Sequence, residues 1–280
     1  MSQFGNISNE IRILKNKGII MKNRLLIGLL VLTATAHFSA QAYSISSTSN
    51  ITIINGKVVS SSLPVVQDAG EIETKQINIS NIRDITLRNI GDLTIEQCRE
   101  CPEILTIMAD KNIMPYLEQQ KDGKRLTLQF DRGVSIATQT SVKYHAVVKD
   151  LEKISLSEAT SAKTSGKIET SNLALDISGA SKIDVSIDVD HLRVDASGAS
   201  EVTLSGKASD QEADISGATQ YRAKSLINKR AHVDASGASE AQIYCTENTT
   251  GHVSGASQLD HYGPAKVNVS KSGVSKVRQH

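Results

Sequence analysis

Residues 192–204 read LRVDASGASEVTL, and the tetrapeptide near their centre decides the fold because it returns at a nearly constant interval. Ser-Gly-Ala followed by Ser or Thr occurs five times, and a sixth copy carries Val in place of Ala. The interval between successive glycines is 18 to 20 residues. A repeat of this length predicts a solenoid in which each copy forms one coil. The six glycines are Gly179, Gly198, Gly217, Gly237, Gly255 and Gly273.

Apolar and polar side chains alternate on both sides of the tetrapeptide, as in LRVDA at 192–196 and EVTL at 201–204. A period of two predicts β-strands rather than helices. A strand, a tight corner and a second strand in every copy describe one coil of a parallel β-helix, in which stacked coils lie about 4.8 Å apart. Right-handed coiling is expected, because parallel crossovers strongly favour this hand. The sequence therefore predicts an all-β fold with about seven coils of 18–21 residues over residues 151–280.

The tetrapeptide has the chemistry of a tight corner. Glycine adopts backbone angles that a side chain opposes, and the Ala or Val that follows it is small enough for the inside of a bend. The serine before each glycine and the hydroxyl residue two positions after it form two columns, whose hydroxyl groups can bond to one another and to the corner backbone. A degenerate copy, Ser157-Glu158-Ala159-Thr160, supplies the first coil. Because Glu158 stands where later copies have glycine, we expect the first corner to be less regular.

The part of the chain before the repeat keeps the strand pattern. Leu-Thr-Ile occurs at 93–95 and again at 105–107. Asp122-Gly123 is a hairpin turn signal between two runs with apolar residues. We therefore predict that residues 71–150 form a curled β-sheet, which covers and continues the first coil. Residues 43–70 are rich in Ser and Thr and are expected to form a tail or an edge strand.

The N-terminal region predicts export. From Met21 the chain has a short basic start, an apolar run at 25–36 and Ala-Gln-Ala at 40–42. This order is typical of a secretory signal peptide, and the run is shorter than the roughly 20 apolar residues of a membrane span. We expect residues 1–42 to be an over-extended start plus a signal peptide, with translation starting at Met21. The mature chain is then periplasmic, on the cell surface or secreted, with no membrane span.

The composition excludes some classes of partner. Without residues 1–42, which hold five of the 31 basic and one of the 30 acidic residues, the net charge is −3. Aromatic residues make up 3% and tryptophan is absent. Such a chain offers neither the positive surface nor the stacking platforms that nucleic-acid binding requires. Lys271, Lys276 and Arg278 place like charges on the last coil, which would repel a second copy there, so we predict a monomer.

The chain resembles a known protein family. The residues that carry the resemblance are the repeats of Asp, Ile or Ala, Ser-Gly-Ala and Ser or Thr, and an upstream block at 105–117, 123–128, 142–148 and 151–156. Over roughly 80–280 it is similar to the head GIN domain family of putative auto-transporter adhesins in bacterial envelopes. The resemblance implies a β-helical fold and a role in adhesion, and it supplies no catalytic residues.

Cys98-Arg99-Glu100-Cys101 is the motif with the most specific chemistry. A redox pair of the thioredoxin type stands at the start of a helix, where the helix N-terminus lowers a thiol pKa. Here the motif lies between two predicted strands, and Pro102 blocks a continued ladder. We therefore favour a structural disulfide between Cys98 and Cys101, which an oxidising compartment permits, over a redox site. Two cysteines are too few for a closed zinc site, and Cys245 is expected to be a free thiol.

A column of acidic residues is expected three positions before the corner glycines. With the coils in register, its four carboxylates stack about 4.8 Å apart, and charges this close raise one another's pKa. Two interpretations remain open. The column binds a cation, for which calcium suits the oxygen ligands, or its carboxylates are solvated and pair with bases such as Arg193. No other metal and no cofactor is predicted. The column consists of Ser155, Asp176, Asp195, Asp214, Asp234, His252 and Ser270.

The sequence predicts a binding protein rather than an enzyme. It has no nucleophile elbow, zinc-protease motif or phosphate loop. His191, His232 and His252 stand seven, five and three positions before their glycines and so share no column. Its acidic residues are spread along the solenoid, whereas a β-helical polysaccharide lyase gathers them in one place. We predict a non-enzymatic adhesin, or a surface or periplasmic binding protein, for an envelope or extracellular ligand (protein or glycan). A lyase-like carbohydrate-active enzyme and a purely structural envelope component are the alternatives.

Overall fold

The computed structural model describes residues 51–54, 57–60, 65–137 and 141–280. The chain divides into two units, residues 1–62 and residues 63–280. In the first unit, β1 (Ile51–Ile54) and β2 (Lys57–Ser60) pair antiparallel. Residues 1–42, predicted to hold an over-extended start and a signal peptide, lie outside the described residues, so this stays a prediction.

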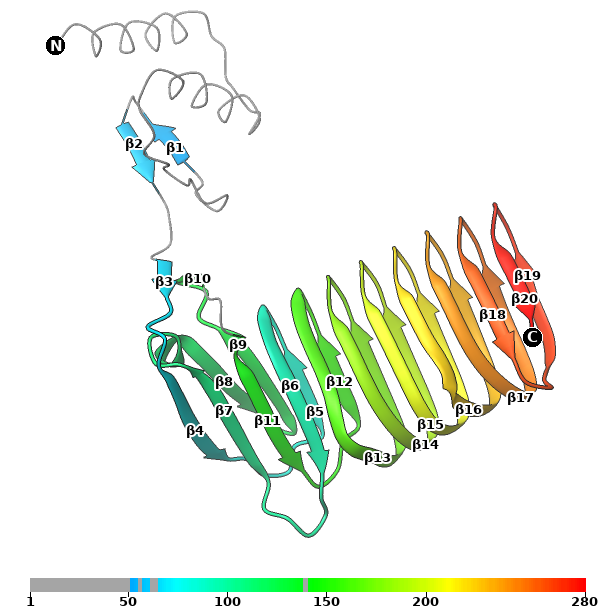
Figure 1. Cartoon of the computed structure of the whole chain (residues 1–280), viewed down its shortest axis with the longest axis horizontal. Coiled ribbons are helices and arrows are strands. Elements are labelled where there is room, and N and C mark those ends of the chain that lie inside the picture. Colours follow the sequence, from blue (N-terminus) through cyan, green and yellow to red (C-terminus); the bar gives the residue numbers. More distant parts are fainter. Residues whose placement is uncertain (1–50, 55–56, 61–64, 138–140) are drawn as a thin grey trace, which may run out of the picture. The chain divides into compact units, whose positions relative to one another are not determined.

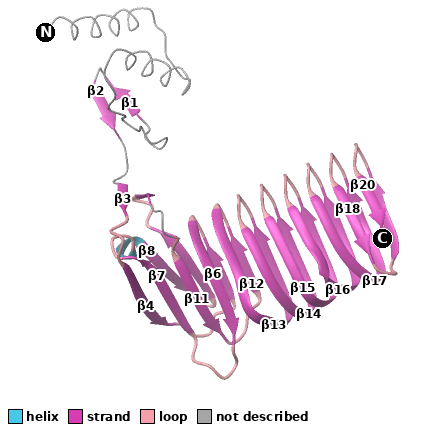
Figure 2. Ribbon diagram, in the orientation of Figure 1, coloured by secondary structure: helices cyan, strands magenta, loops and turns pink. Residues whose placement is uncertain are grey.

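The second unit is built on a stack of parallel β-coils (Figures 1 and 2). Five long strands each pair in parallel with the next strand of the series. At the C-terminal end β17 pairs with β18 and β19, and β18 pairs with β20. The predicted all-β solenoid of about seven coils is therefore confirmed. The strands are β13 (Ala159–Ile177), β14 (Lys182–Ala196), β15 (Glu201–Ile215), β16 (Gln220–Ala235), β17 (Glu240–Val253), β18 (Gln258–Tyr262), β19 (Lys266–Lys271) and β20 (Lys276–Gln279).

The corner glycines are required for two separate reasons. Gly217 has a φ of +76°, and a Cβ atom there would lie 2.4 Å from the carbonyl oxygen of Gly198 in the preceding coil. That same oxygen accepts a hydrogen bond from the backbone N–H of Ala218, at 2.8 Å. At the glycine corners, neighbouring coils thus touch through their backbones and leave no space for a side chain.

The second hydroxyl column closes each corner from inside. Thr219 is fully buried, and its hydroxyl donates to the carbonyl oxygen of Ser216 in its own coil, at 2.7 Å. Ser200 does the same to Ser197, at 2.6 Å. The column predicted from the sequence is present, and its hydroxyl groups bond both within a coil and between coils. Ser239 donates to the carbonyl oxygen of Ser236 in its own coil, at 3.0 Å, and its hydroxyl lies 3.1 Å from that of Ser257 in the next coil.

The interior of the coils is filled by the inward side chains of the alternating pattern. One inward column runs through four coils in register, and all four of its side chains are 0% exposed. Complete burial of one Val or Leu side chain contributes about 1.5–3 kcal/mol. The hydrophobic core therefore lies inside the coils themselves. The column consists of Leu175, Val194, Ala213 and Val233.

The solenoid begins earlier than the repeat predicts. β5 (Asp84–Leu87) and β6 (Ile90–Gln97) pair in parallel with β12 (Lys153–Leu156) and β13, and so form one more coil. Its corner residue is Asn89, with a φ of +72°, and the next corner is Glu158, with a φ of +70°. The expectation of an irregular first corner was wrong. Glu158 adopts the left-handed conformation of the glycines, and its carbonyl oxygen accepts the N–H of Ala180 as in later coils.

The cap of the solenoid uses strands that are distant in sequence. β9 (Arg125–Phe130) pairs with β5, and β11 (Lys143–Val148) pairs with β6, both in parallel. Antiparallel strands complete the cap: β8 (Leu117–Asp122) on β9, β7 (Ile104–Asp110) on β11, and β4 (Ile72–Asn78) on β7. The β8–β9 pair confirms the hairpin predicted at Asp122-Gly123. The remaining elements are β3 (Val65–Gln67), which pairs with β10 (Ser135–Ala137), and the 3-10 helix η1 (Met114–Tyr116).

Within the described residues, no helix has both the length and the hydrophobicity of a membrane span.

Candidate functional site

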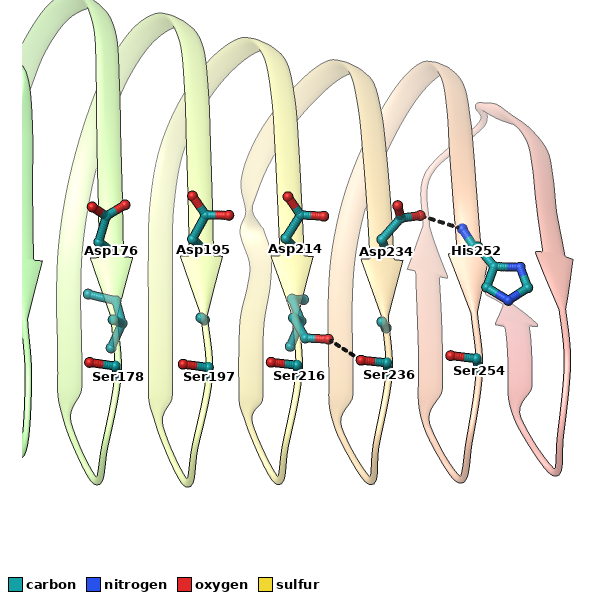
Figure 3. A pocket seen from close by; sticks show the side chains of 14 residues that line it. Asp176, Ser178, Asp195, Ser197, Asp214, Ser216, Asp234, Ser236, His252 and Ser254 are labelled. Carbon is teal, nitrogen blue, oxygen red and sulfur yellow. Dashed lines mark hydrogen bonds between the residues drawn. The ribbon is translucent and has the colours of Figure 1, made fainter.

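The predicted acidic column is in register. Asp176 faces Asp195, Asp195 faces Asp214, and Asp214 faces Asp234 on adjacent strands. His252 follows Asp234 at the next coil. The strand alternation turns these side chains outward, while the Ile or Ala after each Asp points into the core. The serine that follows is outward again. Four successive coils therefore present one carboxylate and one hydroxyl on the same side, and the fifth presents His252 and Ser254 (Figure 3).

The two columns line a groove of about 430 Å³ that runs across five coils (Figure 3). We call it the Asp–Ser groove. Its floor is the strand segment between each Asp and Ser. Its outward residues are Asp176, Asp195, Asp214, Asp234 and His252 in one column and Ser178, Ser197, Ser216, Ser236 and Ser254 in the other.

Basic groups beside the groove compensate only part of its negative charge. Lys153 forms an ion pair with Asp176. The guanidinium of Arg193 lies 3.1 Å from Asp195 and 3.7 Å from Asp214. Arg193 also lies 3.5 Å from Glu212, so one base serves three acidic residues in the middle coils. These carboxylates remain about half exposed, so they are accessible to a ligand.

Asp214 has the least favourable position in the column. Burial raises its pKa, and the carboxylates of Asp195 and Asp234 on the adjacent coils raise it further. Arg193 acts in the opposite direction but does not cancel the effect. The charged form of Asp214 therefore destabilises the folded chain.

Asp214→Asn is expected to increase the free energy of unfolding at pH 7, by no more than about 1 kcal/mol because the side chain is 45% exposed. A carboxyl group with a raised folded-state pKa destabilises the fold once the pH rises above its unfolded value, near 3.9. The gain should therefore be present at pH 7 and disappear toward pH 3. Thermal unfolding of both proteins across this range measures it. Asp176→Asn is the control, since it breaks the pair with Lys153 and should not stabilise; a gain from Asp214→Asn that does not change with pH would contradict the explanation.

Cation binding by this column was one of the two interpretations that the sequence left open. Among the described residues, no group of three or more His, Cys, Asp and Glu side chains has a geometry that could hold a metal ion. The register places one carboxylate of the column on each coil, and the guanidinium of Arg193 lies between those of Asp195 and Asp214. His252 binds Ser270 and Ser272 through its ring nitrogens, at 2.8 and 3.0 Å. The solvated, ion-paired arrangement is the one that these contacts favour.

The structure contains a disulfide between Cys98 and Cys101, with the Cα atoms 5.3 Å apart. It lies in the loop between β6 and β7, away from the residues that line the Asp–Ser groove. Cys245 is free and fully buried, and its thiol contacts the carbonyl oxygens of Lys229 and Asn248. None of the three cysteines contributes to the groove.

A buried polar network inside coils β15 to β17 was not predicted. Asn228 is fully buried and donates to the Gln211 side chain, at 2.5 Å, and Gln211 donates to the hydroxyl of Tyr221, at 2.9 Å. The sequence contained one signal. The interval from Gly217 to Gly237 is 20 residues, the longest between corner glycines, and β16 has register shifts there.

Comparison with known proteins identifies the family. The family model described as "putative auto-transporter adhesin, head GIN domain" matches residues 83–265. The chain belongs to this family. The matched head GIN domain starts just before β5 and includes every residue that lines the Asp–Ser groove. None of the curated proteins compared with the chain gives a match.

Solved structures share the fold of this head GIN domain. A putative adhesin from Bacteroides fragilis is 19% identical, with a TM-score of 0.74, over 77% of this chain and 100% of that one. A putative adhesin from Parabacteroides merdae is 20% identical, with a TM-score of 0.64, over 78% and 99%. A protein named a putative lipid binding protein, from Parabacteroides distasonis, is 18% identical, with a TM-score of 0.63, over 77% and 99%. At such identities the likeness establishes the fold alone.

Proposed function

We propose that this head GIN domain protein is an exported, non-enzymatic adhesin that binds an extended external ligand along the Asp–Ser groove. The observation that carries the proposal is the repetition of one carboxylate and one hydroxyl on each of four successive coils along a continuous groove. The family description supports the adhesive role, and the leader-like sequence at 21–42 supports export.

The chemistry of the groove suits a polymer. A single hydrogen bond contributes only about 0.5–1.5 kcal/mol net, so one coil alone binds weakly. A ligand with regularly spaced hydroxyl, amide or ammonium groups would make the same contacts on several coils at once. Asp195 and Asp214 lie at the middle of the groove and offer partly uncompensated carboxylates to such groups. Affinity should therefore increase with ligand length.

A binding screen of the purified protein against glycans and extracellular-matrix proteins tests the proposal. We expect at least one ligand whose affinity falls about tenfold or more when Asp195→Asn and Asp214→Asn are combined, because charged acceptors at the centre of the site are removed. The matched control combines Asp184→Asn and Asp190→Asn, which remove the same charge from exposed positions on β14 outside the groove.

Three outcomes would contradict the proposal. Equal losses in the two double variants would place binding outside the groove. The absence of any ligand would favour a purely structural envelope component. Release of a soluble product from a bound glycan would favour the lyase-like enzyme.

A further inference from the structure

The loop at 98–103 makes an unusual connection in the cap. It joins β6 to β7, which are consecutive in the sequence but are not neighbours in the sheet. β11 lies between them, parallel to β6 and antiparallel to β7. The loop must therefore cross the end of β11 (Figure 1). We call it the crossover loop.

The disulfide between Cys98 and Cys101 closes the first part of the crossover loop. Both cysteines are half-buried, whereas Arg99 and Glu100 between them are exposed. The backbone N–H of Cys98 is fixed to the end of β11, because it donates to the carbonyl oxygen of Val148 at 2.9 Å. The disulfide therefore holds Cys101, and the chain that follows it, near the end of β11.

Glu103 ends the crossover loop and holds the turn at residues 79–82. Its carboxylate accepts hydrogen bonds from the backbone N–H groups of Asn81, at 2.8 Å, and Ile82, at 3.3 Å. Its carbonyl oxygen accepts the N–H of Ile79, at 3.0 Å. Asn81 has a φ of +55°, a left-handed conformation that requires support from its surroundings. The held turn leads directly into β5, the first strand of the solenoid.

We propose that the Cys98–Cys101 disulfide is a redox-sensitive lock on the cap, opened by an external dithiol. A thiolate of the dithiol attacks one sulfur, the S–S bond breaks, and the other cysteine leaves as a thiolate. The second thiol of the reductant then closes its own disulfide and releases the first cysteine. Two electrons and two protons pass from the dithiol to the protein. The freed loop no longer fixes Glu103, and the amides of Asn81 and Ile82 lose their acceptor.

Amide hydrogen exchange of the full chain, followed by mass spectrometry with and without dithiothreitol, tests the lock. We expect peptides that contain residues 79–84 to exchange about tenfold faster or more after reduction, since the hydrogen bonds of Asn81 and Ile82 to the charged Glu103 carboxylate are lost. Peptides from the coil around Gly198 should exchange at an unchanged rate. Cys245 is a free, buried cysteine, so peptides that contain it should also exchange at an unchanged rate and serve as an internal reference.

Two variants separate the lock from a general effect of the reductant. Cys98→Ser combined with Cys101→Ser should exchange fast at 79–84 in both conditions. Glu103→Gln keeps the disulfide but weakens the hydrogen bonds from Asn81 and Ile82 to this side chain, so exchange at 79–84 should already be fast in the oxidised protein. Equal exchange of 79–84 in the oxidised and reduced wild-type protein would overturn the proposal. So would loss of protection throughout the coils on reduction, because the disulfide would then support the whole fold rather than one turn.

Discussion

Gly217→Val is expected to lower the free energy of unfolding by about 2–5 kcal/mol. A left-handed backbone conformation costs a residue with a side chain about 1–2 kcal/mol, and forced overpacking costs about 1–3 kcal/mol more. The added Cβ would lie 2.4 Å from the Gly198 carbonyl oxygen, so the hydrogen bond from Ala218 to that oxygen is strained as well. Urea unfolding, followed by circular dichroism, measures the loss.

Gly70→Val isolates the conformational part of this effect. Gly70 has a φ of +81°, close to that of Gly217, but no atom lies within 4 Å of an added Cβ. Its expected loss is about 1–2 kcal/mol, the conformational cost alone. Gly273→Val should fall between the two, because the contact there is longer, at 2.8 Å. Equal losses at Gly217 and Gly70 would argue against the backbone contact between stacked corners.

Asn228→Ala is expected to lower the free energy of unfolding by about 2–4 kcal/mol. The side chain amide donates to Gln211 and to the carbonyl oxygens of Leu226 and Tyr244 inside the solenoid. Alanine leaves these buried acceptors without a donor, and an unsatisfied buried polar group costs about 1–3 kcal/mol. Thermal unfolding of the variant measures the loss.

Asn172→Ala is the control for this substitution. Asn172 lies on β13 and its side chain is exposed, so its replacement should change the free energy of unfolding by less than about 0.5 kcal/mol. A small effect at both positions would show that the interior network does not stabilise the coils.

The regular coils could be predicted because their signals are local and repeated. The glycine, the small residue after it and the alternating walls occur in every copy, so strand type, coil length and the Asp column all follow from spacing. The register confirms that column from Asp176 to Asp234. The groove itself was not predicted, since the hollow along the Asp and Ser columns depends on the path of the backbone in space, which spacing does not encode.

The earlier coil and the cap could not be predicted in the same way. The coil of β5 and β6 has Asn89 at its corner, where no glycine marks the turn. The insertion of β11 between β6 and β7 joins strands that are far apart in sequence, and no local pattern encodes such pairing. The Asn228 network was missed because single polar residues at inward positions resemble outward ones in the sequence.

The proposed role of the Asp–Ser groove is tested most directly by amide hydrogen exchange of the wild-type protein with and without its tightest ligand from the binding screen. We expect slower exchange at 193–197, 212–216 and 232–236, the groove segments of three consecutive coils, and no change on the other wall at 201–205 and 220–224. Protection of the other wall, or of neither wall at a saturating ligand concentration, would contradict the assignment of the groove as the binding surface.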